Sequence, residues 1–224
     1  MSDKSTVPKI QETKIDRSSI PFIENKSHCI NTQLREIIKV NSYVCSCKSN
    51  KKKDKASLSY LINIPISQSE CIKLGYALEK VLCDIILKYN KSLKNMKQSN
   101  SKGKREKDHL FFDKYKKIIY YAELKSNINL DTEKSKATKN KCLTIFEELE
   151  EEYPDYEIQW CLVGLRYINN QEIPTTIYDK YKDISDNVYG INDYMEMLSI
   201  NLKFDEETYK QFLNDIVLGM FKSL

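Results

Sequence analysis

Two carboxylates and a lysine, Asp108, Glu123 and Lys125, stand close enough in the sequence to form one chemical site. Two carboxylates brought together repel each other, and burying both is costly without a cation. Magnesium would relieve that repulsion, because it is a hard cation that prefers oxygen ligands and keeps several waters for chemistry. A lysine beside the pair can orient or deprotonate an attacking water and stabilise charge on a phosphate. These residue types therefore predict magnesium-assisted hydrolysis of a phosphodiester.

The Glu123-Leu-Lys125 triplet is distinguished by its context. Similar triplets begin at Glu12 and Glu24, so the spacing alone says little in a chain with 30% charged residues. The third triplet follows an apolar, β-prone run at 118–122, where a strand is expected to enter a polar loop. A solvent-facing salt bridge between strands is the simpler alternative for the same residues.

A β-hairpin over residues 108–125 is what would bring the three residues together. Apolar runs at 109–112 and 117–122 flank the polar stretch 113–116, which predicts a turn. A turn of two or four residues would pair Phe112 with Lys117, so that paired positions sum to 229. Asp113, a competing acid, would then lie in the turn, far from the triplet.

This pairing places Asp108 opposite Tyr121. Side chains alternate between the faces of a strand, and cross-strand partners share a face. Asp108 would therefore lie on the same side as Lys125 and Glu123, with Glu123 as its diagonal neighbour. A three- or five-residue turn would break the parity, so the prediction depends on an even-length turn.

The elements around the hairpin predict an α/β fold with a mixed central β-sheet flanked by helices. Ser67 and Glu70 form a capping box ahead of a helix with a 3.6-residue apolar period that should run to about Lys94. Residues 97–104 read as a loop. The other expected elements are strands at 42–48, 57–64 and 158–165, a helix capped by Asp131 or Thr132 that continues through Leu149 and ends before Pro154, and a mostly helical remainder finishing in a helix over about 205–221.

Length and composition predict one soluble domain over residues 1–224, with a flexible or partner-dependent arm at 1–20. No apolar run approaches about 18 residues, and the first residues lack the apolar centre of a secretory signal, so we expect a cytoplasmic protein without a membrane partner. Its seven cysteines are then expected as free thiols. The spacing of His28, Cys29, Cys45 and Cys47 fits no standard structural zinc site.

Asp108, followed by Glu123-Leu-Lys125, resembles the PD-(D/E)xK nuclease superfamily, and residues 122–134 are most similar to its type II restriction endonucleases. The resemblance covers about residues 68–165 as a catalytic core. It implies a restriction-endonuclease-like fold in which the first acid and the glutamate bind the metal and the lysine serves the water. A glutamate on the preceding helix often assists, and Glu79 matches that role. Lys107 replaces the proline of the pattern, which is among its most variable positions.

The function expected from these residues is sequence-specific cleavage of double-stranded DNA with Mg²⁺, leaving 5′-phosphate and 3′-hydroxyl ends. A small cutter of this kind usually reads a palindrome as a homodimer. The net charge of +4 is modest, but lysines cluster in two loops, and asparagines follow the triplet. The alternatives are a resolvase or repair nuclease on the same core, or a non-catalytic DNA-binding protein. The candidate DNA-contacting residues are Lys51, Lys52, Lys53, Lys102, Lys104, Arg105, Lys107, Asn127, Asn129, Lys134 and Lys136.

Overall fold

The structure is a computed structural model that describes residues 68–96 and 106–221. The strands predicted at 42–48 and 57–64, the arm at 1–20 and the loop at 97–104 lie outside these ranges. Within them, no helix is both long and apolar enough to cross a membrane.

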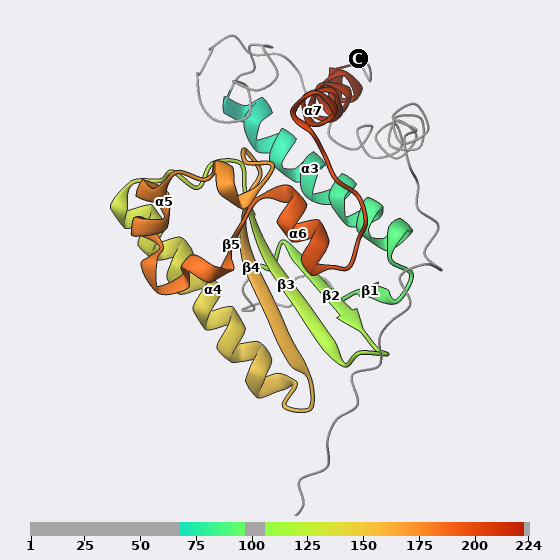
Figure 1. Cartoon of the computed structure of the whole chain (residues 1–224), viewed down its shortest axis with the longest axis vertical. Coiled ribbons are helices and arrows are strands. Elements are labelled where there is room, and N and C mark those ends of the chain that lie inside the picture. Colours follow the sequence, from blue (N-terminus) through green and yellow to red (C-terminus); the bar gives the residue numbers. More distant parts are fainter. Residues whose placement is uncertain (1–67, 97–105, 222–224) are drawn as a thin grey trace, which may run out of the picture.

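A five-stranded mixed sheet forms the centre of the described chain (Figure 1). Its spatial order follows the sequence: β1 (Leu93–Asn95), β2 (His109–Asp113), β3 (Ile118–Lys125), β4 (Glu157–Gly164) and β5 (Val188–Tyr189). β2 is antiparallel to both of its neighbours, β1 and β3, whereas β3, β4 and β5 run parallel to one another. The prediction of a mixed α/β sheet is confirmed, and the strand predicted at 158–165 is central, between β3 and β5.

The hairpin keeps the predicted parity but has a different register. Paired positions in β2 and β3 sum to 231, as in His109 with Ala122, so the predicted pairing of Phe112 with Lys117 is wrong by two residues. The sequence had placed Asp113 in the turn, and this prediction is wrong. Asp113 is a buried residue at the end of β2. Its Oδ1 accepts hydrogen bonds from the backbone N–H groups of Tyr115 (3.0 Å) and Lys116 (3.1 Å), which starts the turn one residue later.

The first described helix, α3 (Gln68–Tyr89), ends five residues before the predicted Lys94. Asn90 ends it, because its Oδ1 accepts hydrogen bonds from the backbone N–H (3.1 Å) and the hydroxyl (2.7 Å) of Ser92. Such a local side-chain bond offers the backbone an alternative to the helix. The chain then forms the short edge strand β1, which the sequence had not indicated.

Two layers of helices cover the sheet (Figure 1). One face carries α3, α6 (Ile191–Met197) and α7 (Glu206–Phe221), and the other carries α4 (Thr132–Glu152) and α5 (Thr175–Lys180). Short 3₁₀ segments lie at Asn170–Glu172 and Lys182–Asn187. The helix predicted after Asp131 is confirmed, with the Asp131 side chain accepting from the backbone N–H of Lys134 at 2.9 Å. The final helix is confirmed as α7.

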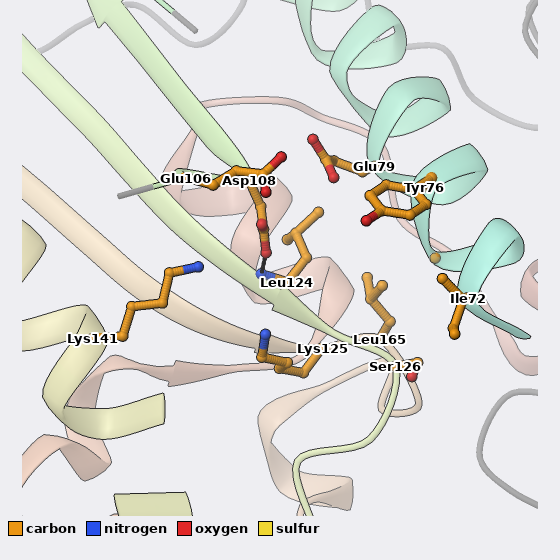
Figure 2. A pocket seen from close by; sticks show the side chains of 11 residues that line it. Ile72, Tyr76, Glu79, Glu106, Asp108, Leu124, Lys125, Ser126, Lys141 and Leu165 are labelled. Atoms are coloured by element: carbon orange, nitrogen blue, oxygen red, sulfur yellow. Dashed lines mark hydrogen bonds between the residues drawn. The ribbon is translucent and has the colours of Figure 1, made fainter. Parts of the chain in front are cut away.

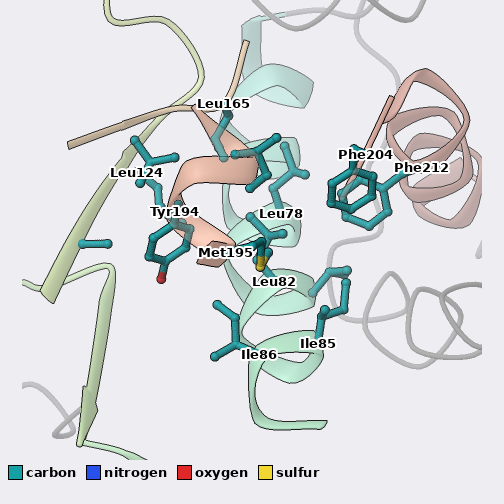
Figure 3. Packing of buried hydrophobic residues seen from close by; sticks show 14 of the residues in the cluster. Leu78, Leu82, Ile85, Ile86, Leu124, Leu165, Tyr194, Met195, Phe204 and Phe212 are labelled. Carbon is teal, nitrogen blue, oxygen red and sulfur yellow. The ribbon is translucent and has the colours of Figure 1, made fainter. Parts of the chain in front are cut away.

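Each face of β3 packs into a separate apolar core. Leu124 and its even-numbered neighbours contribute to a core with Leu78 and Leu82 of α3 and Tyr194 of α6 (Figure 3). The odd-numbered residues face α4 instead; the members of that second core include Ile119, Tyr121, Cys142, Ile145, Trp160 and Leu162. Because side chains alternate along the strand, Glu123 and Lys125 belong to the α4 side of the sheet.

Candidate active site

Asp108 lies immediately before β2 and is held by the backbone of the neighbouring strand. Its Oδ2 accepts a hydrogen bond from the backbone N–H of Leu124 at 2.8 Å. Extending the hairpin register by one position places Asp108 directly opposite Glu123, where the sequence had predicted a diagonal neighbour. The structure therefore brings both predicted acids to the same end of the hairpin.

Glu123 is the most enclosed member of the group, with no exposed surface. Its Oε1 accepts from Nζ of Lys125 at 2.7 Å, and its Oε2 accepts from Nζ of Lys141 at 2.6 Å. The Tyr121 hydroxyl also donates to Oε2, at 3.3 Å. A buried carboxylate needs such partners, because burial of an unpaired charge is strongly unfavourable.

A pocket of about 400 Å³ opens beside these residues (Figure 2). Asp108, Lys125 and Lys141 line one side of it, and Glu79 lines it from α3. Ile72 and Tyr76, which precede Glu79 on the same helix, also line the pocket, although more than half of each side chain is exposed. The pocket thus gives solvent and a ligand access to Asp108 and to both ammonium groups, while Glu123 lies behind them.

The charges of the group are unevenly compensated. Burial raises the pKa of Asp108 to about 6, with a further contribution from the negative charge of Glu123. Among the described residues, no ammonium or guanidinium nitrogen lies within 4.0 Å of the Asp108 carboxylate. Burial lowers the pKa of Lys125, but attraction to Glu123 outweighs it, so the net pKa is raised and this lysine stays protonated.

Glu79 is placed by a contact between α3 and β2. The ring of His109, which follows Asp108, hydrogen-bonds the backbone carbonyl of Glu79 through Nε2 at 2.8 Å and the Tyr194 hydroxyl through Nδ1 at 2.7 Å. The carbonyl can only accept, so Nε2 carries a proton. This bond fixes α3 against the start of β2. Figure 2 shows the Glu79 side chain directed toward the part of the pocket where Asp108 lies.

None of the predicted DNA-contacting residues that the structure describes lines the pocket. Asn127 accepts from the backbone N–H of Asn129 in a local turn, and Asn129 accepts from Lys180 on α5. Lys134 pairs with the helix-capping Asp131 at 2.9 Å. Lys107 is half-buried beside Asp108, and Lys136 is exposed on α4, but neither lines the pocket. Lys51, Lys52, Lys53, Lys102, Lys104 and Arg105 lie outside the described residues.

Lys141 is a member of the group that the sequence reasoning missed. It stands on α4, away from the triplet, and reaches Glu123 across the sheet face. A signal was available: Thr138, Cys142 and Ile145 form the buried stripe of α4, and Lys141 borders it. A lysine at the edge of a buried stripe, on the helix that follows an acidic strand end, is a candidate partner for the acid.

The two acids suit a cation that shares its coordination with water or phosphate. Among residues 68–96 and 106–221, no group of three or more His, Cys, Asp or Glu side chains is arranged to hold a metal ion. Magnesium commonly takes only one or two carboxylates and completes its shell with water and substrate phosphate. The incompletely compensated Asp108 and the oxygen-only donor set therefore fit magnesium.

No protein-family model, curated protein or solved structure was found to match this chain.

Proposed function

We propose that this chain is a Mg²⁺-dependent endonuclease that hydrolyses phosphodiester bonds of double-stranded DNA, of the type II restriction class within the PD-(D/E)xK superfamily. The observation that carries the proposal is the meeting of Asp108, Glu123 and Lys125 at one end of a hairpin, beside an open pocket. The order of helix, hairpin, helix and parallel strand around them is consistent with a restriction-endonuclease-like core.

Asp108 and Glu123 are the residues that would hold the metal. When bound, Mg²⁺ would polarise the phosphate and acidify a coordinated water. The backbone N–H of Leu124 fixes the Asp108 carboxylate, so this ligand needs little reorganisation. Lys125 fixes Glu123 from the other side while leaving about a third of its own side chain exposed.

Lys125 places a permanent positive charge at the wall of the pocket. Its ammonium can donate hydrogen bonds to the attacking water and to the negative charge that develops on the phosphate. Glu79, on the opposite wall, supplies a carboxylate that can orient that water or take up its proton. The reaction proposed is in-line attack of water on phosphorus, which yields a 5′-phosphate and a 3′-hydroxyl.

The DNA partner and the homodimer are further parts of this proposal. A palindromic duplex has two-fold symmetry, and one copy of the proposed site would cut one strand, so cutting both strands calls for two copies. The role of the exposed Lys136 in contacting phosphate belongs to the same hypothesis.

The test is digestion of a long plasmid of known sequence by the full chain with Mg²⁺. We expect discrete fragments whose ends map to one short sequence. Lys125→Met should reduce the rate at least about a hundredfold, as for loss of a transition-state donor. Lys203→Met, which removes an exposed lysine paired with Glu196 at 3.7 Å, is the matched control and should cut normally.

Other results separate the alternatives. Cuts only at branched DNA would assign a resolvase, and random nicking would assign a nuclease without sequence specificity. Duplex binding with no Mg²⁺-dependent cleavage under any of these conditions would refute the enzymatic proposal and leave Glu123 as the centre of a structural ion-pair group.

A further inference from the structure

Lys141 and Lys125 together give Glu123 more positive charge than one carboxylate requires. Their Nζ atoms lie 2.6 and 2.7 Å from its two oxygens. Asp108 lies beside the same group, yet its hydrogen bond comes from the neutral backbone of Leu124. The two acids and two lysines sum to zero charge, but both cations are gathered on one acid. One ammonium is therefore available for another partner.

Lys141 is the lysine that can leave. Lys125 is two residues from Glu123 on the same strand and the same face, so its position is tied to that of the carboxylate. Lys141 comes from the facing helix α4, whose position is fixed by the buried Cys142 and Thr138 and not by the lysine itself. Its flexible four-carbon stem lets the ammonium move while the helix stays in place.

The pocket is the space into which the Lys141 ammonium can move when it leaves Glu123. About 29% of its side chain is exposed, and the residue lines the pocket together with Asp108 and Lys125. Figure 2 shows Lys141 and Lys125 reaching from two different elements toward the region of Asp108. A phosphodiester entering the pocket is an anion that an ammonium released from Glu123 would meet.

We propose that Lys141 holds Glu123 in the metal-free protein and moves to a DNA phosphate when a divalent cation takes its place on Glu123. This inference rests on the proposed function. Lys141 is thus both a competitor of the metal and a phosphate-binding residue, and the two roles alternate. The exchange keeps the buried Glu123 carboxylate paired with a cation at every stage.

The first arm of the test measures Mg²⁺ binding by isothermal titration without DNA. Lys141→Met keeps the apolar stem but removes the competing charge, so Mg²⁺ should bind about tenfold more tightly than to the wild type, or more. Lys141→Arg keeps the charge and should bind Mg²⁺ as weakly as the wild type. Lys139→Met is the matched control, because Lys139 is on the same helix but pairs with Asp183.

The second arm measures binding of a DNA duplex with Ca²⁺ in place of Mg²⁺. Lys141→Met should weaken Ca²⁺-dependent binding about tenfold, and the slope of log affinity against log salt should fall by about one, as for loss of one phosphate contact. In EDTA, the variant and the wild type should bind alike, because Lys141 is then occupied by Glu123. Thermal unfolding of each variant checks that the fold is retained.

The outcomes distinguish failure of the inference from failure of the proposed function. Mg²⁺ binding by Lys141→Met that is unchanged or weaker than in the wild type overturns the exchange, as does a loss of DNA affinity of the same size in EDTA. If the wild type cuts DNA while either result holds, only the exchange has failed. If the wild type neither binds Mg²⁺ nor cuts DNA, both proposals fall.

Discussion

Replacing Asp108 with asparagine should stabilise the metal-free protein at alkaline pH. Asparagine has nearly the same shape and can still accept the hydrogen bond from the Leu124 N–H, which is 2.8 Å long. What it removes is a negative charge that is buried beside Glu123 and has no ammonium within 4.0 Å among the described residues. The Asp108 carboxylate, which we propose for catalysis, thus lowers the free energy of unfolding of the metal-free protein.

The size of the effect follows from the pKa of Asp108. Burial and Glu123 raise it from 3.8 to about 6. Since each pKa unit corresponds to about 1.4 kcal/mol, ionised Asp108 lowers the free energy of unfolding by about 3 kcal/mol. The folded pKa lies above the unfolded one, so the penalty is absent below pH 4, grows between pH 4 and 6, and is complete above pH 7.

The assay is urea unfolding in EDTA at pH 4 and pH 8, followed by fluorescence of Trp160, the chain's single tryptophan, which is buried. Asp108→Asn should exceed the wild type by about 3 kcal/mol at pH 8 and match it at pH 4. A variant that is equally stable or less stable than the wild type at pH 8 would refute the reasoning, as would a difference that does not depend on pH.

Asp113 provides a control with the opposite sign. Burial alone would raise its pKa, but hydrogen bonds from the Lys116 N–H, the Ser92 hydroxyl and the Tyr115 N–H lower it overall. A lowered folded pKa means that the ionised form contributes stability at neutral pH, which is lost as the pH falls. Asp113→Asn should therefore be less stable than the wild type at pH 8, measured in the same urea titration, and the difference should shrink toward acid pH.

The remaining predictions concern the packing around the site. Glu123→Gln should lower the free energy of unfolding, measured in urea, by about 3 kcal/mol, because it leaves two partly buried ammonium groups without their counter-charge. An unchanged free energy would show that these ion pairs do not stabilise the fold. Gly190→Ala should lower the melting temperature by several degrees, since its Cβ would lie 2.8 Å from the backbone carbonyl carbon of Asn169. Gly75→Ala, on α3, would meet nothing within 4 Å and should instead stabilise by about 0.5–1 kcal/mol; equal effects of the two glycine changes in calorimetry would show that backbone crowding is not the cause.

The side on which the acids stand could be predicted from the sequence, whereas the register could not. Parity depends only on alternation along a strand and an even turn, and the four-residue turn at 114–117 satisfies it. The register depends on where the turn begins, and the bonds from Asp113 to the backbone of Tyr115 and Lys116 decide that. Apolar patterning carries no information about such bonds, so the prediction missed by two residues.

The failure to predict Lys141 as a member of the site had a different cause. Lys141 meets Glu123 only because α4 crosses the face of β3 at a particular rotation, a tertiary property that a local motif does not encode. The edge strands β1 and β5 span three and two residues, too few to display a period of two. Longer elements, such as the capped helix α4 and the apolar strand β4, were predicted within a few residues of their observed ends.

The order in which the strands pair has a consequence for how the molecule folds. From β2 to β4, residues 109–164, each strand pairs with the next one in the chain, and α4 is the crossover that joins the parallel pair. The β2–β3 hairpin closes across the four-residue turn at 114–117, and α4 is the next element in the chain, so their contacts close short loops, which favours early formation; β3 and β4 pair across a longer connection. We therefore expect the hairpin and α4 to form the folding nucleus and α7 to dock later. Ile119→Val and Ile145→Val should slow refolding, while Ile216→Val should mainly speed unfolding; the reverse pattern in stopped-flow kinetics would contradict this order. On that order, Asp108, Glu123 and Lys141 would meet before the chain is fully folded.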